Sequence, residues 1–381
     1  IELLPLDYGD VANSDAIPAK FKALGVNLHG DYNRVNGNLM RGRMSGRIAE
    51  AVRSQAALLA ASPAYSEASA VTWAEAARYA AAVLDNIGGV SGMDPNGGTW
   101  YTNTDEINAL ASGANPKEII WRSDKSNSTD GPGIELERNN FPPSLYGNGR
   151  VNPTQNLVNA FPMENGYPIG DPQSGYNAES PYANRDPRLT KYILVNGSTA
   201  GPSSTAITTG TYGTNNDAIN REAGQSTRTG YYLRKLLRQD VNPNPTINNA
   251  QYHYTARIRY TEIFLNYAEA ANEAYGPTGK GTHAYSAYDV IKAIRARAKV
   301  GAANGDAYLE SIKGDKDKMR ELIRNERRLE LCFENFRFWD LRRWKADLNQ
   351  TALGITIDKQ ISGTLTYTPL NVENRVYADY M

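Results

Sequence analysis

The sequence has very little cysteine and histidine, no excess of either charge and no long apolar run. Its single cysteine, Cys332, excludes an internal disulfide and a cysteine-rich zinc site. The three histidines, at positions 29, 253 and 283, are too scattered to predict a His-rich metal centre. Lysine plus arginine and aspartate plus glutamate each number 41, so the basic face of a nucleic-acid binder is not expected. The composition therefore predicts a protein without metal, cofactor or nucleic acid.

The chain has 381 residues and begins Ile1-Glu2-Leu3, with no initiator Met. No signal-peptide pattern opens it, and no apolar run approaches the roughly 18 residues of a membrane span. A chain of this length can bury about 75% of its unfolded surface, so it needs no covalent or metal staple to fold. We expect either a processed start or a fragment of a longer protein.

The spacing of apolar and small residues predicts helices near both ends of the chain. Thr72 with Glu75, and Ser286 with Asp289, have the spacing of capping boxes that begin helices. The predicted helices span residues 41–62, 73–87, 256–275, 286–299 and 317–348.

Alanine is frequent in the predicted helices, which indicates close helix–helix packing. The pairs 41–87 and 256–299 each have about the length of one tetratricopeptide repeat, roughly 34 residues. Trp73, Trp339 and Trp344 lie on predicted helices, so we expect them in the core. The fold class predicted is mainly α, with tetratricopeptide-like helix pairs, a large loop-rich insertion and minor β structure.

Proline is concentrated in the middle of the chain, where 14 of the 19 prolines lie between 95 and 245. Long helices are excluded there, and only a short helix at 105–112 and a strand at 118–122 are predicted. Disorder is the competing interpretation, but the many tyrosines and tryptophans argue against it. From residue 351 onward, alternating residues such as Ile355-Thr356-Ile357 predict minor strands.

Two charged or glycine-rich patterns have both a structural and a functional interpretation. Residues 276–282 superficially resemble a phosphate-binding loop, but Gly281 follows Lys280 where Ser or Thr is required. We interpret them as a helix–helix turn. The run 324–330 could bind an anion, but its alternating signs favour a helix carrying exposed Glu–Arg pairs at one-turn spacing.

Paired carboxylates raise the alternative of a glycoside hydrolase, which needs two acids about 5–10 Å apart. Glu135 with Glu137, or Asp94 with Asp105, could be nominated. Nothing distinguishes these pairs among the 41 acidic residues, and no nucleophile-elbow or zinc-protease motif occurs. We therefore predict a protein that is not an enzyme and assign no catalytic residue. A calcium loop at 94–96 lacks the required spacing, so no metal ligand is assigned.

Aromatic residues in predicted loops are the best candidates for a ligand site. Sugars stack their C–H faces on Trp and Tyr, while their hydroxyls bond to Asn, Asp and Arg. A large aromatic side chain in a glycine-rich loop, such as Trp100, is harder to explain as core than one on a helix. The candidate ligand residues are Trp100, Tyr101, Asn103, Tyr146, Tyr176 and Tyr212.

Several stretches, in the same order along the chain, resemble the SusD/RagB family. They cover nearly the whole sequence: residues 47–63, 73–80, 153–166, 184–189, 259–270, 294–298, 325–331 and 336–344. The last includes the signature-like Phe336-Arg337-Phe338-Trp339-Asp340-Leu341-Arg342-Arg343-Trp344. As in that family, we divide a single SusD-like domain, 1–381, into a helix pair (41–90), a loop-rich ligand face (91–250), C-terminal helical repeats (251–350) and a tail (351–381).

The resemblance implies a cell-surface lipoprotein of Bacteroidetes outer membranes. Such proteins bind an oligosaccharide or polysaccharide, or sometimes peptides as RagB-like proteins do, without cleaving it. They act as a lid on a TonB-dependent SusC-like outer-membrane barrel. The family's lipidated N-terminal Cys is not present in this chain. Ligand residues vary within the family, so none is carried over by motif. A hydrolase and a pure protein-binding scaffold remain open alternatives.

Overall fold

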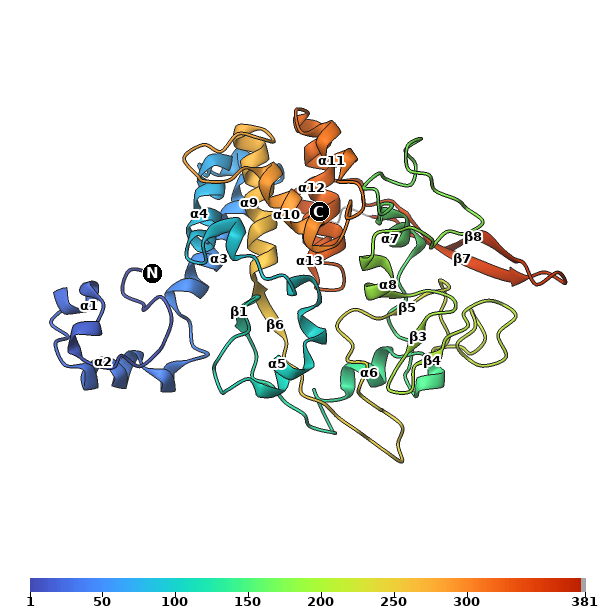
Figure 1. The fold of residues 1–381 in the computed structure, drawn as a ribbon, viewed down its shortest axis with the longest axis horizontal. Helices are drawn as coiled ribbons and strands as arrows, with labels where there is room; N and C mark the ends of the chain where they lie inside the picture. Colours follow the sequence, from blue (N-terminus) through green and yellow to red (C-terminus); the bar gives the residue numbers. More distant parts are fainter. Residues whose placement is uncertain (378–381) are drawn as a thin grey trace.

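The computed structural model describes residues 1–377 and is dominated by helices, as the sequence predicts. Figure 1 shows a cluster of long helices near the centre, a loop-rich region on one side and a separate N-terminal arm on the other. The long helices are α3 (Gly46–Ala61), α4 (Trp73–Asp85), α9 (Tyr260–Tyr275), α10 (Ala287–Arg297) and α12 (Lys316–Glu330). The N-terminal arm carries α1 (Ala19–Ala23) and α2 (His29–Asn36).

Both predicted capping boxes begin a helix. The Thr72 side chain accepts from the Glu75 amide while the Glu75 carboxylate accepts from the Thr72 amide, at the start of α4. Ser286 and Asp289 make the same exchange at the start of α10. Each pair satisfies two backbone amides that the first helical turn leaves without a partner.

Three helix predictions extend too far. Residues 41–45, predicted as the start of a helix, lie before α3, which begins at Gly46. Residues 256–259 form strand β6 (Ala256–Arg259), which pairs antiparallel with β1 (Ile119–Arg122) before α9 begins. The predicted helix 317–348 is two helices, α12 and α13 (Phe336–Arg343). The turn between them holds Phe333 and Asn335 at positive φ, a left-handed conformation that ends an α-helix.

Small side chains let the central helices approach one another closely. Ala77 and Ala80 of α4 and Ala268 and Ala271 of α9 are fully buried in one core. Larger apolar residues from α3, α10 and α12 complete that core. The alanine-rich packing predicted from the sequence is therefore present.

The loop-rich region has hydrophobic cores of its own. Short helices α5 (Thr104–Ala109), α6 (Glu135–Asn140), α7 (Gln155–Ala160) and α8 (Arg188–Tyr192) are joined by long loops. Two-residue strands pair as β2 (Ile193–Leu194) with β5 (Tyr232–Leu233), and β3 (Thr199–Ala200) with β4 (Thr205–Ala206). Buried Phe161, Tyr192 and Tyr231 lie in one of these cores, so aromatic packing replaces regular helix contacts here.

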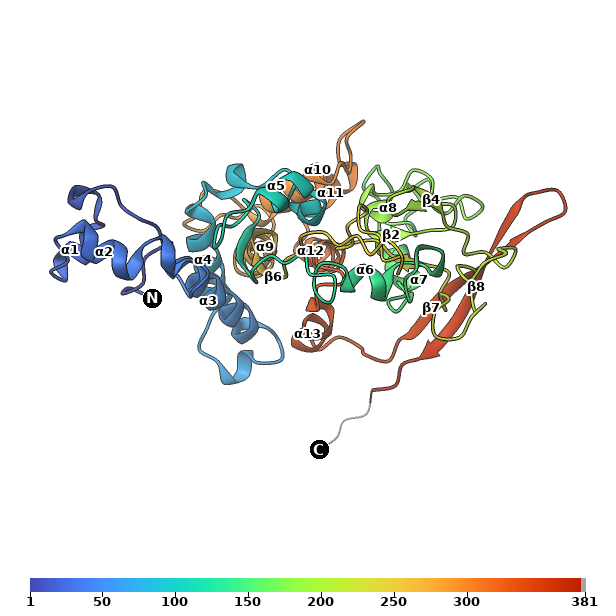
Figure 2. The same cartoon turned by 90° about the horizontal axis from the view of Figure 1, so that it is seen from below.

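The tail forms a longer hairpin than predicted. Strand β7 (Thr351–Lys359) pairs antiparallel with β8 (Leu365–Asn374), and Ile355 and Ile357 are buried on one face. Figure 2 shows this hairpin extending away from the helices, along the loop-rich region. The short α11 (Ala307–Ile312) precedes α12. No helix among residues 1–377 is long and apolar enough to cross a bilayer.

The three tryptophans expected in the core differ in how deeply they are buried. Trp344 is buried, and Trp73 packs partly buried against the main core. Trp339 is 62% exposed, so its prediction is wrong. The break before α13 turns Asp340 and Arg343 inward and leaves Phe338 and Trp339 on the outer face.

Candidate functional site

A cavity of about 780 Å³ lies where the helical cluster meets the loop-rich region. Its wall comes from the 3-10 helix η5 (Gly97–Thr102), from α6, from β6 and the residues before it, and from the turn between α12 and α13. Most of the lining is apolar, with a few polar groups among it. A concave, largely apolar site of this size is typical of small-ligand binding.

Aromatic rings form one wall of this cavity. The Trp100 ring stacks on the Tyr254 ring, with centroids 5.1 Å apart, and meets Tyr101 edge-on at 5.7 Å. Trp100 is 8% exposed and Tyr101 is 3% exposed. The Arg122 guanidinium lies 5.3 Å from the Tyr254 ring centre. Trp100 is thus part of the inner wall of a cavity and not an open platform on the surface.

Three buried polar atoms on this wall have no partner within residues 1–377. They are the indole nitrogen Nε1 of Trp100, the Tyr254 hydroxyl and the Oε2 atom of Glu262. All three residues line the cavity. A buried polar group without a hydrogen-bond partner costs about 1–3 kcal/mol of folding free energy. A ligand or water that forms hydrogen bonds with these three groups would remove that penalty.

A histidine–carboxylate pair adds polarity beside the aromatic wall. His253 Nε2 lies 2.9 Å from Glu137 Oε1, and His253 Nδ1 lies 2.8 Å from the Gln251 carbonyl. The Glu137 carboxylate also accepts from the Arg238 amide at 2.8 Å. Burial alone would lower the pKa of His253, but the hydrogen bond and charge of Glu137 raise it. The pair therefore favours an imidazolium that donates from both nitrogens.

Glu262, at the start of α9, is the cavity's most perturbed carboxyl group. Burial raises its pKa to about 7, although Arg327 and a hydrogen bond from Gln55 oppose that shift. Gln55 Nε2 donates to Glu262 Oε1 at 2.7 Å. Near neutral pH this side chain is therefore both a donor and an acceptor toward the cavity.

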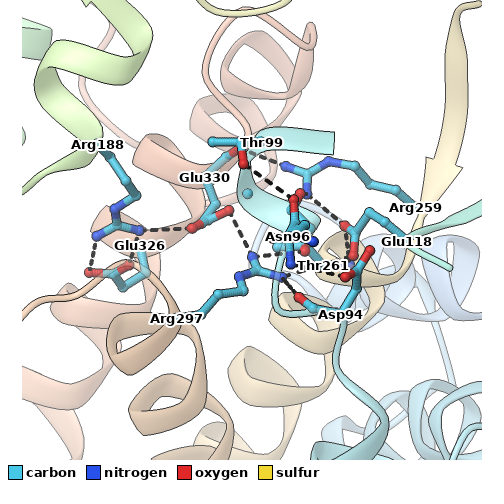
Figure 3. A network of polar contacts seen from close by, with 12 residues as sticks. Asp94, Asn96, Thr99, Glu118, Arg188, Arg259, Thr261, Arg297, Glu326 and Glu330 are labelled. Atoms are coloured by element: carbon cyan, nitrogen blue, oxygen red, sulfur yellow. Dashed lines mark hydrogen bonds and ion pairs between the residues drawn. The ribbon is translucent and has the colours of Figure 1, made fainter. Parts of the chain in front are cut away.

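Buried ion pairs hold the segment that carries Trp100 (Figure 3). Arg259 Nη1 donates to Glu118 Oε1 at 2.8 Å and to the Gly97 carbonyl at 3.5 Å. The Tyr192 hydroxyl donates to the Gly98 carbonyl at 2.8 Å. A Cβ on Gly97 would lie 2.3 Å from Glu118 Oε2, so only glycine fits at this approach.

Glu330 lies at the centre of this network, between two arginines (Figure 3). Its carboxylate accepts from Arg297 and from Arg188, each at 3.0 Å. Arg297 also donates to the Asp94 carbonyl at 3.3 Å, just before the Trp100 segment. Burial alone would raise the pKa of Glu330, but these arginines, with Arg259 and Lys235, lower it to about 2. The carboxylate stays ionised and fixes α12 to the loops around it.

The charged run 324–330 is structural, as predicted, but its pairs are not exposed. Glu326, Arg327 and Glu330 are buried. Their partners lie on other elements: Glu326 accepts from Arg188 at 2.7 Å, and Arg327 donates to Asp340 at 2.8 Å. The spacing within the run gives no sign of these partners, because Arg188 lies far away in the sequence and Asp340 lies on the next helix, α13.

The candidate ligand residues lie in several places. Trp100 and Tyr101 line the cavity together. Asn103 does not line it, and its side chain donates to Glu106 at 2.7 Å. The other three also lie outside its wall: Tyr146 is 54% exposed, Tyr176 stacks under Arg185, and Tyr212 accepts from Asn196. A ligand role for the six stays a prediction.

Three cavity-lining residues, Tyr252, His253 and Tyr254, are not among the candidates predicted from the sequence. The signal was present, because three ring-bearing residues in succession precede a strand. His253 was considered only as a possible metal ligand. Among residues 1–377, no group of three or more His, Cys, Asp or Glu side chains is placed to hold a metal ion.

Comparison with known sequences gives one consistent result. The model of the SusD family matches residues 117–377. Two curated proteins of Formosa agariphila are similar to this chain: SusD-like protein P38 is 32% identical over 112 residues, and SusD-like protein P25 is 31% identical over 113. These matches cover 29% and 30% of this chain but only 20% and 19% of the two relatives.

Solved structures agree with that result. A SusD-like protein of Bacteroides fragilis is 25% identical, with a TM-score of 0.62 over 90% of this chain and 62% of that one. A SusD-like carbohydrate-binding protein of the same species is 22% identical, with a TM-score of 0.63 over 98% of this chain and 64% of that one. The chain therefore spans less than two thirds of these structures, and it shares their fold.

Proposed function

The chain belongs to the SusD family, and from that premise we propose that it binds a glycan at the Trp100–Tyr254 cavity without cleaving it. The observation that carries the proposal is the pairing of stacked aromatic rings with unpartnered polar atoms in one cavity. Aromatic rings complement the C–H faces of sugars, and the indole and hydroxyl groups complement their oxygens.

The proposal extends to the protein's partner and place. The glycan is passed to a TonB-dependent SusC-like barrel, and the protein acts at the cell surface, on the outer membrane. The family resemblance of the sequence supports this part, since relatives of this kind act as lids on such barrels. A test is co-purification of the protein with its barrel from outer membranes, and recovery of the protein without any barrel would contradict it.

Calorimetric titration with neutral and acidic oligosaccharides, and with a peptide mixture beside them, tests the binding. We expect at least one saccharide to bind and to be recovered intact by chromatography. Shortened products would favour the hydrolase alternative. Binding of peptides alone would favour the peptide-capture alternative, and binding of the barrel with no soluble ligand would favour a scaffold.

Removing the Tyr254 hydroxyl tests whether the sugar binds in the cavity. Tyr254→Phe removes a buried hydroxyl that has no partner within the described chain, so stability should hold or rise slightly. If a sugar bonds that hydroxyl, its affinity should fall about tenfold, in line with the loss of one hydrogen bond.

The matched control is Tyr285→Phe, whose hydroxyl donates to Asp85 and which does not line the cavity. This variant should lose some stability and keep its affinity. Unchanged affinity in Tyr254→Phe, with binding intact in both variants, would place the glycan elsewhere.

A further inference from the structure

A second cavity, of about 370 Å³, adjoins the first and has a different chemistry. Tyr101 lines both cavities. The segment 234–239 also separates them: Leu236 and Arg238 line the first, while Arg234 and Leu237 line the second. Tyr101 and this segment therefore form a wall between the two cavities, which lie side by side.

The second cavity has two cations and no acid in its lining. Arg234 and Lys191 line it, together with the hydroxyl-bearing residues Thr99, Thr102 and Thr190. A carboxylate would neutralise these cations, but neither forms an ion pair with any residue of 1–377. The Arg234 side chain donates only to the Thr199 carbonyl, at 3.1 Å.

Other buried or partly buried arginines, such as Arg122, Arg185 and Arg328, also lack a carboxylate partner within residues 1–377, but Arg234 shares a hollow with a second cation, Lys191, and with no acid. Arg188, Arg259 and Arg295 are all more buried than Arg234, and each contacts at least two carboxylates. Arg234 is half-buried, and desolvation lowers its pKa without a carboxylate to offset it. The Arg234 guanidinium, the Lys191 ammonium and the hydroxyl groups around the same hollow are all donors. Together they can donate hydrogen bonds to the oxygens of an anionic group.

We propose that the second cavity binds the negatively charged group of an acidic saccharide whose sugar rings occupy the Trp100–Tyr254 cavity. The inference rests on the proposed function and narrows it to glycans that carry carboxylate or sulfate groups. Guanidinium and ammonium donors suit both groups, so the structure identifies the shared oxyanion chemistry. Charge-assisted hydrogen bonds are roughly twice as strong as neutral ones, so the anionic group should add markedly to affinity.

The test is calorimetric titration of the full chain with three probes: trigalacturonate, a sulfated galactotriose and unmodified galactotriose. In low salt, at least one acidic probe should bind at least tenfold more tightly than the neutral one, and added salt should shrink that difference. The acidic probe that binds more tightly identifies whether carboxylate or sulfate is the preferred group.

Charge-removing variants connect the effect to the second cavity. Arg234→Met should weaken the acidic probe about tenfold and Lys191→Met about threefold, with the neutral probe unchanged. Lys313→Met and Arg34→Met remove the same charges from exposed positions outside both cavities and should change neither. These controls separate a local contact from the general field of the protein.

The possible outcomes are distinct. Equal affinity for acidic and neutral probes, or unchanged acidic affinity in both cavity variants, overturns the inference and leaves the proposed glycan binding standing. No binding of any saccharide overturns the proposed function and this inference with it. Selective loss of acidic binding in the two cavity variants supports the inference.

Discussion

The helical cluster and its junction with the loop-rich region are stabilised in different ways. In the cluster, helices α4 and α9 meet through buried alanines. At the junction, buried arginines and glutamates such as Arg188, Glu326 and Glu330 connect segments more than a hundred residues apart. Apolar contacts tolerate small changes of shape, whereas a buried charge network requires every partner.

This difference explains how loops without long helices can position a binding cavity. The segment around Trp100 has little regular structure, but its carbonyls accept from Arg259, Arg297 and Tyr192. Glu118 holds Arg259 in turn, and Glu330 holds Arg297.

Arg188→Met should cause the largest loss of stability, roughly 3–5 kcal/mol. It leaves Asp186, Glu326 and Glu330 without one of their cations in a buried place. Urea unfolding followed by circular dichroism measures the change. Arg34→Met is the matched control, because Arg34 and Asp31 are largely exposed and their pair should contribute very little. Similar small losses in both variants would contradict the importance of the network.

Glu262→Gln should raise stability in a pH-dependent way. The folded-state pKa of Glu262 is about 7 and the unfolded value is about 4.5, so the wild-type protein loses stability as pH rises between them. Glutamine has no proton to lose and keeps an oxygen to accept from Gln55. The variant should match the wild type below pH 4 and gain roughly 3 kcal/mol above pH 8. A gain that is constant with pH would show that Glu262 does not titrate in this range.

Ala80→Leu should destabilise the helical cluster by roughly 1–3 kcal/mol. Ala80 is fully buried in the core shared by α4 and α9, where a larger side chain forces the helices apart. Ala56→Leu, on an exposed position of α3, controls for the change in residue type. Thermal unfolding of the two variants measures the difference. Equal unfolding midpoints would show that the contact between α4 and α9 accommodates a larger side chain.

His253→Gln should have the smallest effect, a change in how the stability of the protein depends on pH. The pKa of His253 is raised in the folded state by Glu137, so the pair's contribution is fully present below about pH 6.5 and is lost as pH rises through the raised value. Stability measured from pH 5 to 9 should fall in this range for the wild type and stay flatter for the variant. Identical slopes would mean that folding does not shift the pKa of His253.

The sequence predicts a helix boundary well where the residues that form it are neighbours in the chain. Thr72 with Glu75 predicts the start of α4, because a capping box is made within four residues. The break at residues 331–335 could not be predicted in the same way. Arg259 and Lys235 both donate to the Glu330 carbonyl there, and these partners lie far away in the sequence.

The candidate site shows the same limit. A loop aromatic side chain predicts a ligand contact, and Trp100 and Tyr101 do line the cavity. The sequence gives no sign that Tyr254, about 150 residues later, stacks on Trp100, because the β1–β6 pairing brings them together. It also gives no sign that Arg234 lacks an acidic partner, since such a lack is visible only in three dimensions.

A structure of the protein with a bound oligosaccharide would show whether the Trp100–Tyr254 cavity holds the sugar. We predict sugar rings in the cavity, with a hydroxyl or ring oxygen within hydrogen-bond distance of Trp100 Nε1 or the Tyr254 hydroxyl. A saccharide bound over the exposed rings of Tyr146 or Tyr212, with the cavity empty of sugar, would contradict it.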